Sequence, residues 1–176
     1  MKRAVFLDRD GVINRVVIKN GRPHPPASLE SFELLPGVPE AIRSLRGAGF
    51  KVIVVTNQPD VATGVQRLDV VREIHAHMRD CLPLDDIKMC CHVDRDQCLC
   101  RKPKPGMLLE AAKEWDLDLQ RSYMVGDRWR DIEAGRAARC KTILVGGGYS
   151  EQPAENPDAV VASLLEAAQL ILSSGL

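Results

Sequence analysis

The stretch Ala4-Val5-Phe6-Leu7-Asp8-Arg9-Asp10-Gly11 joins a short apolar run directly to two carboxylates that lie two residues apart. Four consecutive apolar residues bounded by polar ones indicate a buried β-strand, and Gly11 can adopt the backbone conformation that a tight turn requires. An Asp-x-Asp pair by itself is usually just a solvated turn. Its significance therefore depends on what the rest of the chain places around it.

Short apolar or β-branched runs alternate along the chain with amphipathic segments of helix length, and this alternation predicts a parallel sheet with crossover helices. Strands are expected at residues 4–7, 52–55, 87–91, 123–125, 142–145 and 159–161. Helices are expected at residues 38–48, 68–81, 107–115, 132–138 and 163–172. The predicted fold class is therefore α/β, a Rossmann-like three-layer arrangement with a mostly parallel sheet, and residues 1–176 are expected to form a single domain.

The overall composition argues against several classes of partner. The 24 Lys and Arg residues balance the 24 Asp and Glu residues, so there is no global positive field to attract nucleic acid or an anionic membrane. The apolar run before Asp8 is far shorter than the core of a signal peptide, and no run reaches membrane-spanning length. We therefore expect a cytoplasmic protein without nucleic-acid or membrane partners. A monomer is also expected, although nothing in the sequence determines the oligomeric state.

Polar residues follow three of the predicted strands: Asp8, Thr56 and Gly126-Asp127. Because the carboxyl ends of parallel strands lie at one edge of a sheet, these residues are expected to converge at the crevice where open α/β sheets bind ligands. If the strands are ordered 3-2-1-4-5-6, the first and fourth strands are neighbours. That order would bring Asp8 beside Asp127.

These residue types suit phosphoryl transfer. A carboxylate such as Asp8 can attack phosphorus and form an aspartyl-phosphate, while Asp10 can protonate the leaving alcohol and then deprotonate a water molecule. The hard oxygen ligands of Asp8 and Asp127 suit Mg²⁺, which offsets the repulsion between an anionic nucleophile and an anionic substrate. Hydrogen bonds and positive charge for the phosphoryl oxygens would come from Thr56, Asn57 and Lys102.

Four segments in chain order resemble the successive motifs of haloacid dehalogenase phosphatases. They are Asp8-Arg9-Asp10-Gly11-Val12-Ile13-Asn14, Val55-Thr56-Asn57-Gln58, Cys100-Arg101-Lys102-Pro103-Lys104-Pro105-Gly106 and Val125-Gly126-Asp127-Arg128-Trp129-Arg130-Asp131. More narrowly, residues 3–148 resemble the small, zinc-containing group that includes heptose bisphosphate phosphatases and histidinol-phosphatases. A large cap domain would need a long insertion after the first or second motif, and neither gap has room for it. A minimal cap and an open site are therefore expected.

The resemblance implies a role for each matching residue. The implied catalytic residues are the nucleophile Asp8, the general acid/base Asp10, and the phosphoryl-stabilising Thr56 and Lys102. The implied ligands of Mg²⁺ are Asp8, Asp127 and the backbone carbonyl of Asp10. Asp131 would either support this site or stabilise the start of its own helix through the helix dipole. The expected substrate-binding residues are Asn57, Arg101 and Arg128.

Four of the six cysteines are crowded between residues 90 and 100, and without an export signal metal binding is a better interpretation than disulfides. The residues that resemble the family's zinc ligands are Cys90, His92, Cys98 and Cys100, enough for a closed tetrahedral site in a loop that leads to Arg101 and Lys102. Cys91 makes the register ambiguous, but alternation along a strand favours Cys90, because residues 90 and 92 then face the same side. Elsewhere we expect buried thiols at Cys81 and Cys140, and ordinary loop or helix-face residues at His24, His75 and His77.

The resemblance implies a small phosphorylated sugar as substrate, specifically the 7-phosphate of D-glycero-D-manno-heptose 1,7-bisphosphate in the synthesis of lipopolysaccharide heptose. Histidinol phosphate and the 3'-phosphate of nucleic-acid ends remain alternatives, because Gln58-Pro59-Asp60 and the short spacing from His92 to Cys98 depart from the heptose enzymes. A phosphoacceptor receiver of a signalling pathway has similar acidic residues, but a stable phospho-signal has no use for an efficient acid/base such as Asp10. A non-catalytic, zinc-stabilised binding module is the remaining alternative.

Overall fold

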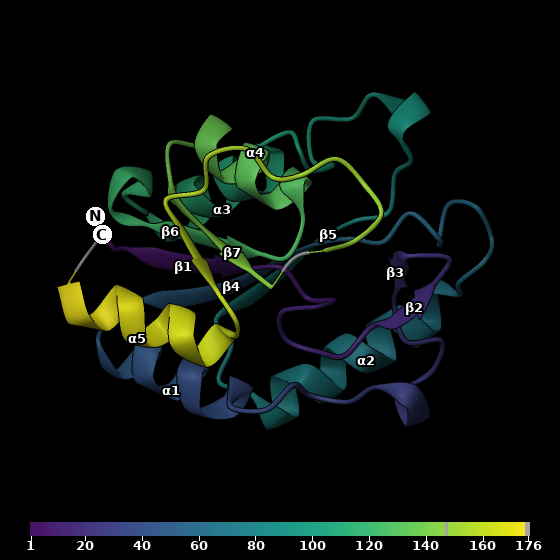
Figure 1. Cartoon of the computed structure of the whole chain (residues 1–176), viewed down its shortest axis with the longest axis horizontal. Helices are drawn as coiled ribbons and strands as arrows, with labels where there is room; N and C mark the ends of the chain where they lie inside the picture. The colour runs from purple at the N-terminus through teal and green to yellow at the C-terminus, as the bar shows by residue number, and fades with distance from the viewer. Residues whose placement is uncertain (147, 175–176) are drawn as a thin grey trace.

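A parallel β-sheet forms the middle layer of the protein, and its computed structural model describes residues 1–146 and 148–174 (Figure 1). Within these residues the sheet has six strands in the spatial order β5-β4-β1-β6-β7-β8. The strands are β1 (Ala4–Leu7), β4 (Lys51–Asn57), β5 (Asp86–Cys90), β6 (Tyr123–Gly126), β7 (Lys141–Val145) and β8 (Ala159–Val161). All neighbouring pairs are parallel, so the α/β fold class is confirmed, and the strand order is the 3-2-1-4-5-6 that was assumed above.

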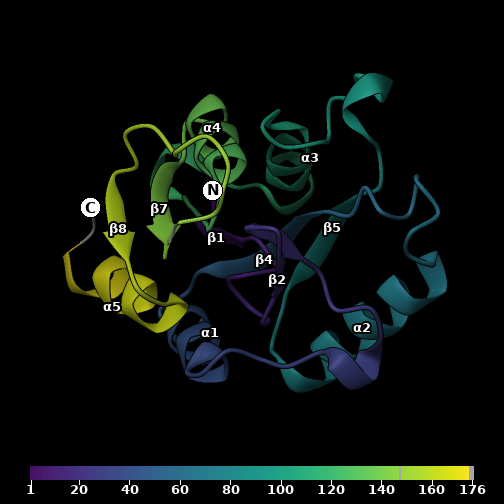
Figure 2. The same cartoon turned by 45° about the vertical axis from the view of Figure 1, so that its right-hand side comes forward.

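Helices cover both faces of the sheet (Figures 1 and 2). One face carries α1 (Val38–Gly47), α2 (Leu68–Cys81) and α5 (Leu164–Ser174), and the other carries α3 (Gly106–Trp115) and α4 (Trp129–Ala137). Val5 and Leu7 of β1 pack into the core on the first face, whereas Ala4 and Phe6 pack into the core on the second. Because β1 is covered on both faces, it needs an uninterrupted apolar run. None of the helices described is long and apolar enough to span a membrane.

Most element boundaries lie within two residues of those expected, and the largest difference is at α4, which begins at Trp129 and not at residue 132. The side chain of Asp131 explains the earlier start, because it accepts a hydrogen bond from the backbone N–H of Arg128 at 3.0 Å and so stabilises the first turn. Of the two isolated thiols, Cys140 is buried as expected. The expectation for Cys81 is wrong, since this last residue of α2 is exposed.

Residues 14–36, where no strand was expected, contain a β-hairpin. In it β2 (Val17–Lys19) pairs antiparallel with β3 (Arg22–His24). The turn residues Asn20 and Gly21 have positive φ angles of 51° and 72°, as in the type I′ turns that Asn-Gly favours. That dipeptide was the sequence signal for the hairpin. Short 3₁₀ turns in the described chain are η1 (Leu29–Ser31), η2 (Asp94–Asp96) and η3 (Leu119–Arg121).

Candidate active site

The carboxyl edge of the sheet brings together polar residues from β1, β4 and β6. Asp8 directly follows β1, and its backbone N–H donates to the carbonyl of Val125 in β6 at 2.9 Å. Thr56 lies near the end of β4, and Asp127 directly follows β6. The exposed fractions of Asp8, Thr56 and Asp127 are only 8%, 0% and 3%. The structure therefore places these residues at one buried edge, in the arrangement that the parallel sheet predicted.

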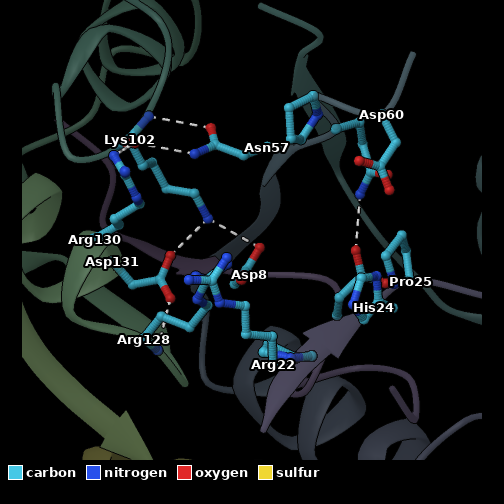
Figure 3. Close-up of a pocket in the computed structure, with 14 residues that line it drawn as sticks. Asp8, Arg22, His24, Pro25, Asn57, Asp60, Lys102, Arg128, Arg130 and Asp131 are labelled. Carbon is cyan, nitrogen blue, oxygen red and sulfur yellow. Dashed lines mark hydrogen bonds and ion pairs between the residues drawn. The ribbon is translucent and has the colours of Figure 1, made fainter. Parts of the chain in front are cut away.

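The ammonium group of Lys102 lies at the centre of this site (Figure 3). Its Nζ is 2.9 Å from Asp8 Oδ1, 2.6 Å from Asp131 Oδ1 and 2.8 Å from the carbonyl oxygen of Val55. Burial alone would lower the pKa of Lys102, but the two carboxylates raise it above its ordinary value. The side chain of Asn57 accepts from the Lys102 N–H at 3.1 Å and donates to the Lys102 carbonyl at 3.0 Å. Lys102 is thus held as a fixed positive charge beside Asp8.

The two carboxylates paired with Lys102 belong to a group of three buried ones in the part of the chain that the structure describes. They are Asp8, Asp131 and Asp127, each with an oxygen within 4.8 Å of the others. Asp127 Oδ2 accepts from the Tyr149 hydroxyl at 2.6 Å, whereas Asp127 Oδ1 is buried with no hydrogen-bond partner among the described residues. Burial and the nearby Asp131 raise the pKa of Asp8 to about 7, and burial and Asp8 raise the pKa of Asp127. A divalent cation with oxygen ligands would balance the excess negative charge, so these residues fit Mg²⁺.

Asp131 both stabilises the start of its own helix and reaches the active site, the two roles considered for it from the sequence. Its Oδ2 accepts the hydrogen bond that stabilises the start of α4, while its Oδ1 pairs with Lys102. A side chain at position 126 would block this arrangement, because a Cβ on Gly126 would lie 2.1 Å from the Cβ of Asp131. Glycine at the end of β6 therefore allows α4 to approach closely enough to bring Asp131 into the site.

The carboxylate of Asp10 is held by donors from three residues. Arg9 donates from Nε to Oδ1 at 3.1 Å and from Nη2 to both oxygens at 3.0 and 2.9 Å. Asn14 Nδ2 donates to Oδ1 at 3.0 Å, and Gln58 Nε2 donates to Oδ2 at 2.8 Å. The same Gln58 amide donates to the Thr56 hydroxyl at 3.0 Å, which leaves the Thr56 O–H free to donate elsewhere. Asp10 is therefore held in one orientation within the site.

A cavity of about 230 Å³ opens at this edge of the sheet (Figure 3). Its lining includes the expected Asp8, Asp10, Asn57, Lys102 and Arg128, and also Arg22, His24, Arg130 and Asp131. Arg130 belongs to the fourth motif, so its position could have been inferred from the sequence. The sequence offers no comparable signal for Arg22 and His24, because they reach the cavity only through the folding back of the β2–β3 hairpin.

Arg101 does not lie where a substrate-binding residue was expected. It is absent from the described lining of the active-site cavity, and its Nε donates to Asp94 Oδ1 at 2.8 Å. Arg130 Nη2 donates to the same carboxylate at 3.2 Å. Arg128 does line the cavity and forms an ion pair with Glu151. Asp94, which the sequence motifs did not single out, is thus a shared partner of Arg101 and Arg130, and of these two only Arg130 lines the cavity.

The predicted zinc ligands form one cluster next to the site, and they are Cys90, His92, Cys98 and Cys100. Their ligand atoms are separated by 3.2 Å between the sulfurs of Cys90 and Cys100 and by 3.7 Å between those of Cys90 and Cys98. Ligands of a tetrahedral zinc ion with zinc–sulfur distances of about 2.3 Å are separated by similar lengths, whereas a disulfide needs about 2.05 Å. Cys90, and not Cys91, contributes its sulfur, as strand alternation favoured. These four residues fit a zinc ion.

Comparison with known proteins places the chain among sugar phosphatases. The HAD-hydrolase-like family model matches residues 99–167. The chain is 36% identical to D-glycero-beta-D-manno-heptose-1,7-bisphosphate 7-phosphatase of Pasteurella multocida over 97% of this chain and 97% of that protein. It is 39% identical to the enzyme of the same name from Escherichia coli K12, over 96% of this chain and 93% of the relative.

Solved structures agree with these relatives. The chain superposes with a TM-score of 0.81 on the D,D-heptose 1,7-bisphosphate phosphatase of B. bronchiseptica, a complex with magnesium and phosphate, at 32% identity over 97% of this chain and 98% of that one. The corresponding protein from Burkholderia thailandensis gives a TM-score of 0.67 at 28% identity, over 98% of this chain and 100% of that one.

Proposed function

Because the chain belongs to the haloacid dehalogenase-like family of heptose bisphosphate phosphatases and is a phosphoric monoester hydrolase, we propose that it removes the 7-phosphate of D-glycero-D-manno-heptose 1,7-bisphosphate. The observation that carries the reaction class is the buried Asp8 beside Lys102, with the oriented carboxyl group of Asp10 in the lining of the same cavity. The choice of substrate rests on the relatives, which match nearly the whole chain.

In the proposed mechanism, Asp8 attacks the phosphorus atom of the substrate. The bond from phosphorus to the sugar oxygen breaks, and Asp10 donates a proton to that oxygen. A water molecule then attacks the aspartyl-phosphate, Asp10 accepts its proton, and inorganic phosphate leaves while the Asp8 carboxylate is restored. The Lys102 ammonium and the Thr56 hydroxyl donate hydrogen bonds to the phosphoryl oxygens as charge redistributes.

Mg²⁺ would be held by the carboxylates of Asp8 and Asp127 and the backbone carbonyl of Asp10, with Asp131 in support. When bound, the ion would offset the repulsion between nucleophile and substrate. This assignment is supported by Asp127 Oδ1, which has no hydrogen-bond partner among the described residues, and by the excess of buried carboxylates over ammonium groups at the site.

A substrate with two phosphates also requires positive charge away from the reacting centre. Arg22, Arg128 and Arg130 line the cavity and would supply it, and bidentate guanidinium groups match phosphate geometry. Zinc held by the Cys90 cluster would fold the loop that leads into Lys102, without a direct part in the chemistry.

The test compares substrates at a fixed Mg²⁺ concentration. Purified protein is supplied with both anomers of the heptose 1,7-bisphosphate, with histidinol phosphate, and with an oligonucleotide that ends in a 3'-phosphate. We expect the highest kcat/KM for a heptose bisphosphate, and phosphorus NMR should show loss of the 7-phosphate with retention of the 1-phosphate. A higher kcat/KM for either alternative would overturn the assigned substrate, and the absence of steady turnover on every substrate would favour the receiver or the binding module.

A further inference from the structure

A buried arginine lies between the two catalytic carboxylates in sequence, yet the proposed mechanism gives it no role. Arg9 has an exposed fraction of 1%, and its guanidinium group donates to both oxygens of Asp10. A buried guanidinium must have its charge balanced and its N–H groups paired, because each unpaired donor carries a desolvation cost. Asp10 meets part of this requirement, but it leaves Nη1 of Arg9 to find another partner.

That partner is a histidine of α2, 66 positions further along the chain. Nε2 of His75 lies 3.1 Å from Nη1 of Arg9, and His75 is buried with an exposed fraction of 6%. A guanidinium can only donate, so Nε2 must be the acceptor and the ring must be neutral, with its proton on Nδ1. His75 lies on a helix face as expected, but that face points inward, where the ring accepts from Arg9.

The chain of hydrogen bonds continues to the carboxyl group of Asp10, the proposed general acid/base. From His75 the hydrogen bonds run through Arg9 to Asp10, whose oxygens also accept from Asn14 and Gln58. If the acceptor at position 75 were lost, Nη1 would remain buried without a partner, and the guanidinium would turn to find one. Such a turn would move the two donors that orient Asp10.

We propose that His75 is a positioning residue that holds Arg9 flat against Asp10, so that the Asp10 carboxyl group is presented to the leaving oxygen in a single orientation. The inference rests on the proposed function, since it needs Asp10 to act as the general acid. It assigns His75 no contact with substrate. Its effect should appear in proton transfer to the leaving group and not in the attack by Asp8.

The test exploits the geometry of Nε2. In His75→Gln the side-chain oxygen can take the place of Nε2 and accept from Arg9, whereas the shorter side chain of His75→Asn cannot reach Nη1. Both variants are assayed on an alkyl phosphate, which needs a protonated leaving group, and on 4-nitrophenyl phosphate, which hardly does. Asp10→Asn serves as the benchmark, and circular dichroism verifies that each variant is folded.

We expect His75→Asn to lower kcat on the alkyl phosphate on the order of tenfold, a fraction of the typical general-acid contribution, with a much smaller loss on 4-nitrophenyl phosphate. KM should hardly change, and His75→Gln should restore most of the activity. Equal losses on both substrates, or equal behaviour of the Gln and Asn variants, would overturn the proposal. If Asp10→Asn itself loses both activities equally, the general-acid role fails and this inference fails with it, while persistent activity in Asp8→Asn would instead refute the nucleophile.

A measurement on the unmodified protein covers the case in which the variants do not fold. Nitrogen-15 NMR of the histidine rings should show His75 neutral, with its proton on Nδ1, at pH 7. A charged ring, or a proton on Nε2, would overturn the proposal because neither form can accept from Arg9.

Discussion

The ionised form of the Asp8 carboxyl group is stabilised by one neighbour and destabilised by others. Its oxygen lies 2.9 Å from Lys102, which favours the ionised form, but burial and the neighbouring Asp131 disfavour it and raise its pKa to about 7. Replacing this carboxyl group therefore has two separate effects. The nucleophile is lost, and so is one of the buried like charges.

We predict that Asp8→Asn lowers steady turnover by on the order of a thousandfold or more, because the amide keeps the shape of the side chain but cannot attack phosphorus. In the absence of Mg²⁺ the variant should be at least as stable as the unmodified protein, because repulsion with Asp131 is relieved and Lys102 keeps Asp131 as a partner. Phosphate release and thermal unfolding measure the two effects. Appreciable turnover in protein free of contaminating phosphatase would contradict the mechanism.

His75 gives a prediction for acid stability. Burial, followed by the charges of Arg9 and Arg79, lowers its pKa from 6.5 to about 4, with only a partial opposing effect of Asp10. As the pH falls, the imidazole of His75 is protonated in the unfolded chain before it is protonated in the folded protein. The contribution of neutral His75 to the free energy of unfolding is therefore fully present above pH 6.5 and is lost as the pH falls towards 4. Between pH 7 and pH 4.5 the unmodified protein should lose roughly 2–3 kcal/mol more than His75→Gln does in urea unfolding. The same pH dependence in both proteins would show that His75 is not held neutral.

At the scale of elements, the loop between β5 and α3 connects the cysteine cluster to the active site. Gly106, the first residue of α3, donates its N–H to the carbonyl of Leu99 at 3.0 Å, and a Cβ there would lie 2.2 Å from that oxygen. The loop is thus packed directly onto the start of α3, only four residues after Lys102. An ion held by the cluster would therefore act on Lys102 through the backbone.

Cys98→Ser should lose zinc, lower the stability by about 2 kcal/mol, which is roughly 4–8 °C in Tm, and reduce activity by displacing Lys102. Cys91→Ser is the matched control, because its sulfur lies outside the cluster, and it should keep both zinc and activity. Elemental analysis, thermal unfolding and phosphate release provide the measurements. Protein prepared without chelator that contains no zinc would refute the site. Loss of zinc in Cys91→Ser would show that Cys91, and not Cys90, is the ligand.

At the scale of the whole molecule, two apolar cores hold the sheet between its helices, and the active-site cavity lies at one edge of this frame. The frame fixes the positions of carboxylates that repel one another. Repulsion among Asp8, Asp127 and Asp131 therefore lowers the free energy of unfolding of the protein. A bound cation would reduce this repulsion and raise the free energy of unfolding.

We predict that Mg²⁺ stabilises the whole protein, by about 2.7 kcal/mol when its concentration is one hundred times the dissociation constant. Asp127→Asn should abolish most of this gain, because it removes a carboxylate from the proposed ligand set. Thermal unfolding is followed during a Mg²⁺ titration at constant ionic strength, with NaCl as the control salt. An unchanged Tm across the titration would contradict the proposed ligands, and an equal gain in Asp127→Asn would show that the ion binds elsewhere.

Much of the fold could be read from local patterns. β1 and β8 begin and end at the expected residues, and so does α2, because apolar runs and helical periodicity are local properties of the chain. The hairpin of residues 17–24 was missed although its Asn-Gly turn is also a local signal. Cys81 was placed wrongly because burial of a helix end depends on which neighbours cover it.

The sequence by itself determined the parallel sheet and the convergence of Asp8, Thr56 and Asp127, because parallel strands direct the residues that follow them to a common edge. The order of the strands, which was only assumed from the sequence, was decided by the tertiary structure. Only the tertiary structure decided that Arg101 pairs with Asp94, that Arg22 and His24 reach the cavity, and that His75 accepts from Arg9. The physical reason is that a charged or polar side chain finds its partner through packing between distant segments. Such pairings produce no periodic pattern and no fixed motif spacing in the sequence, so they cannot be predicted from it.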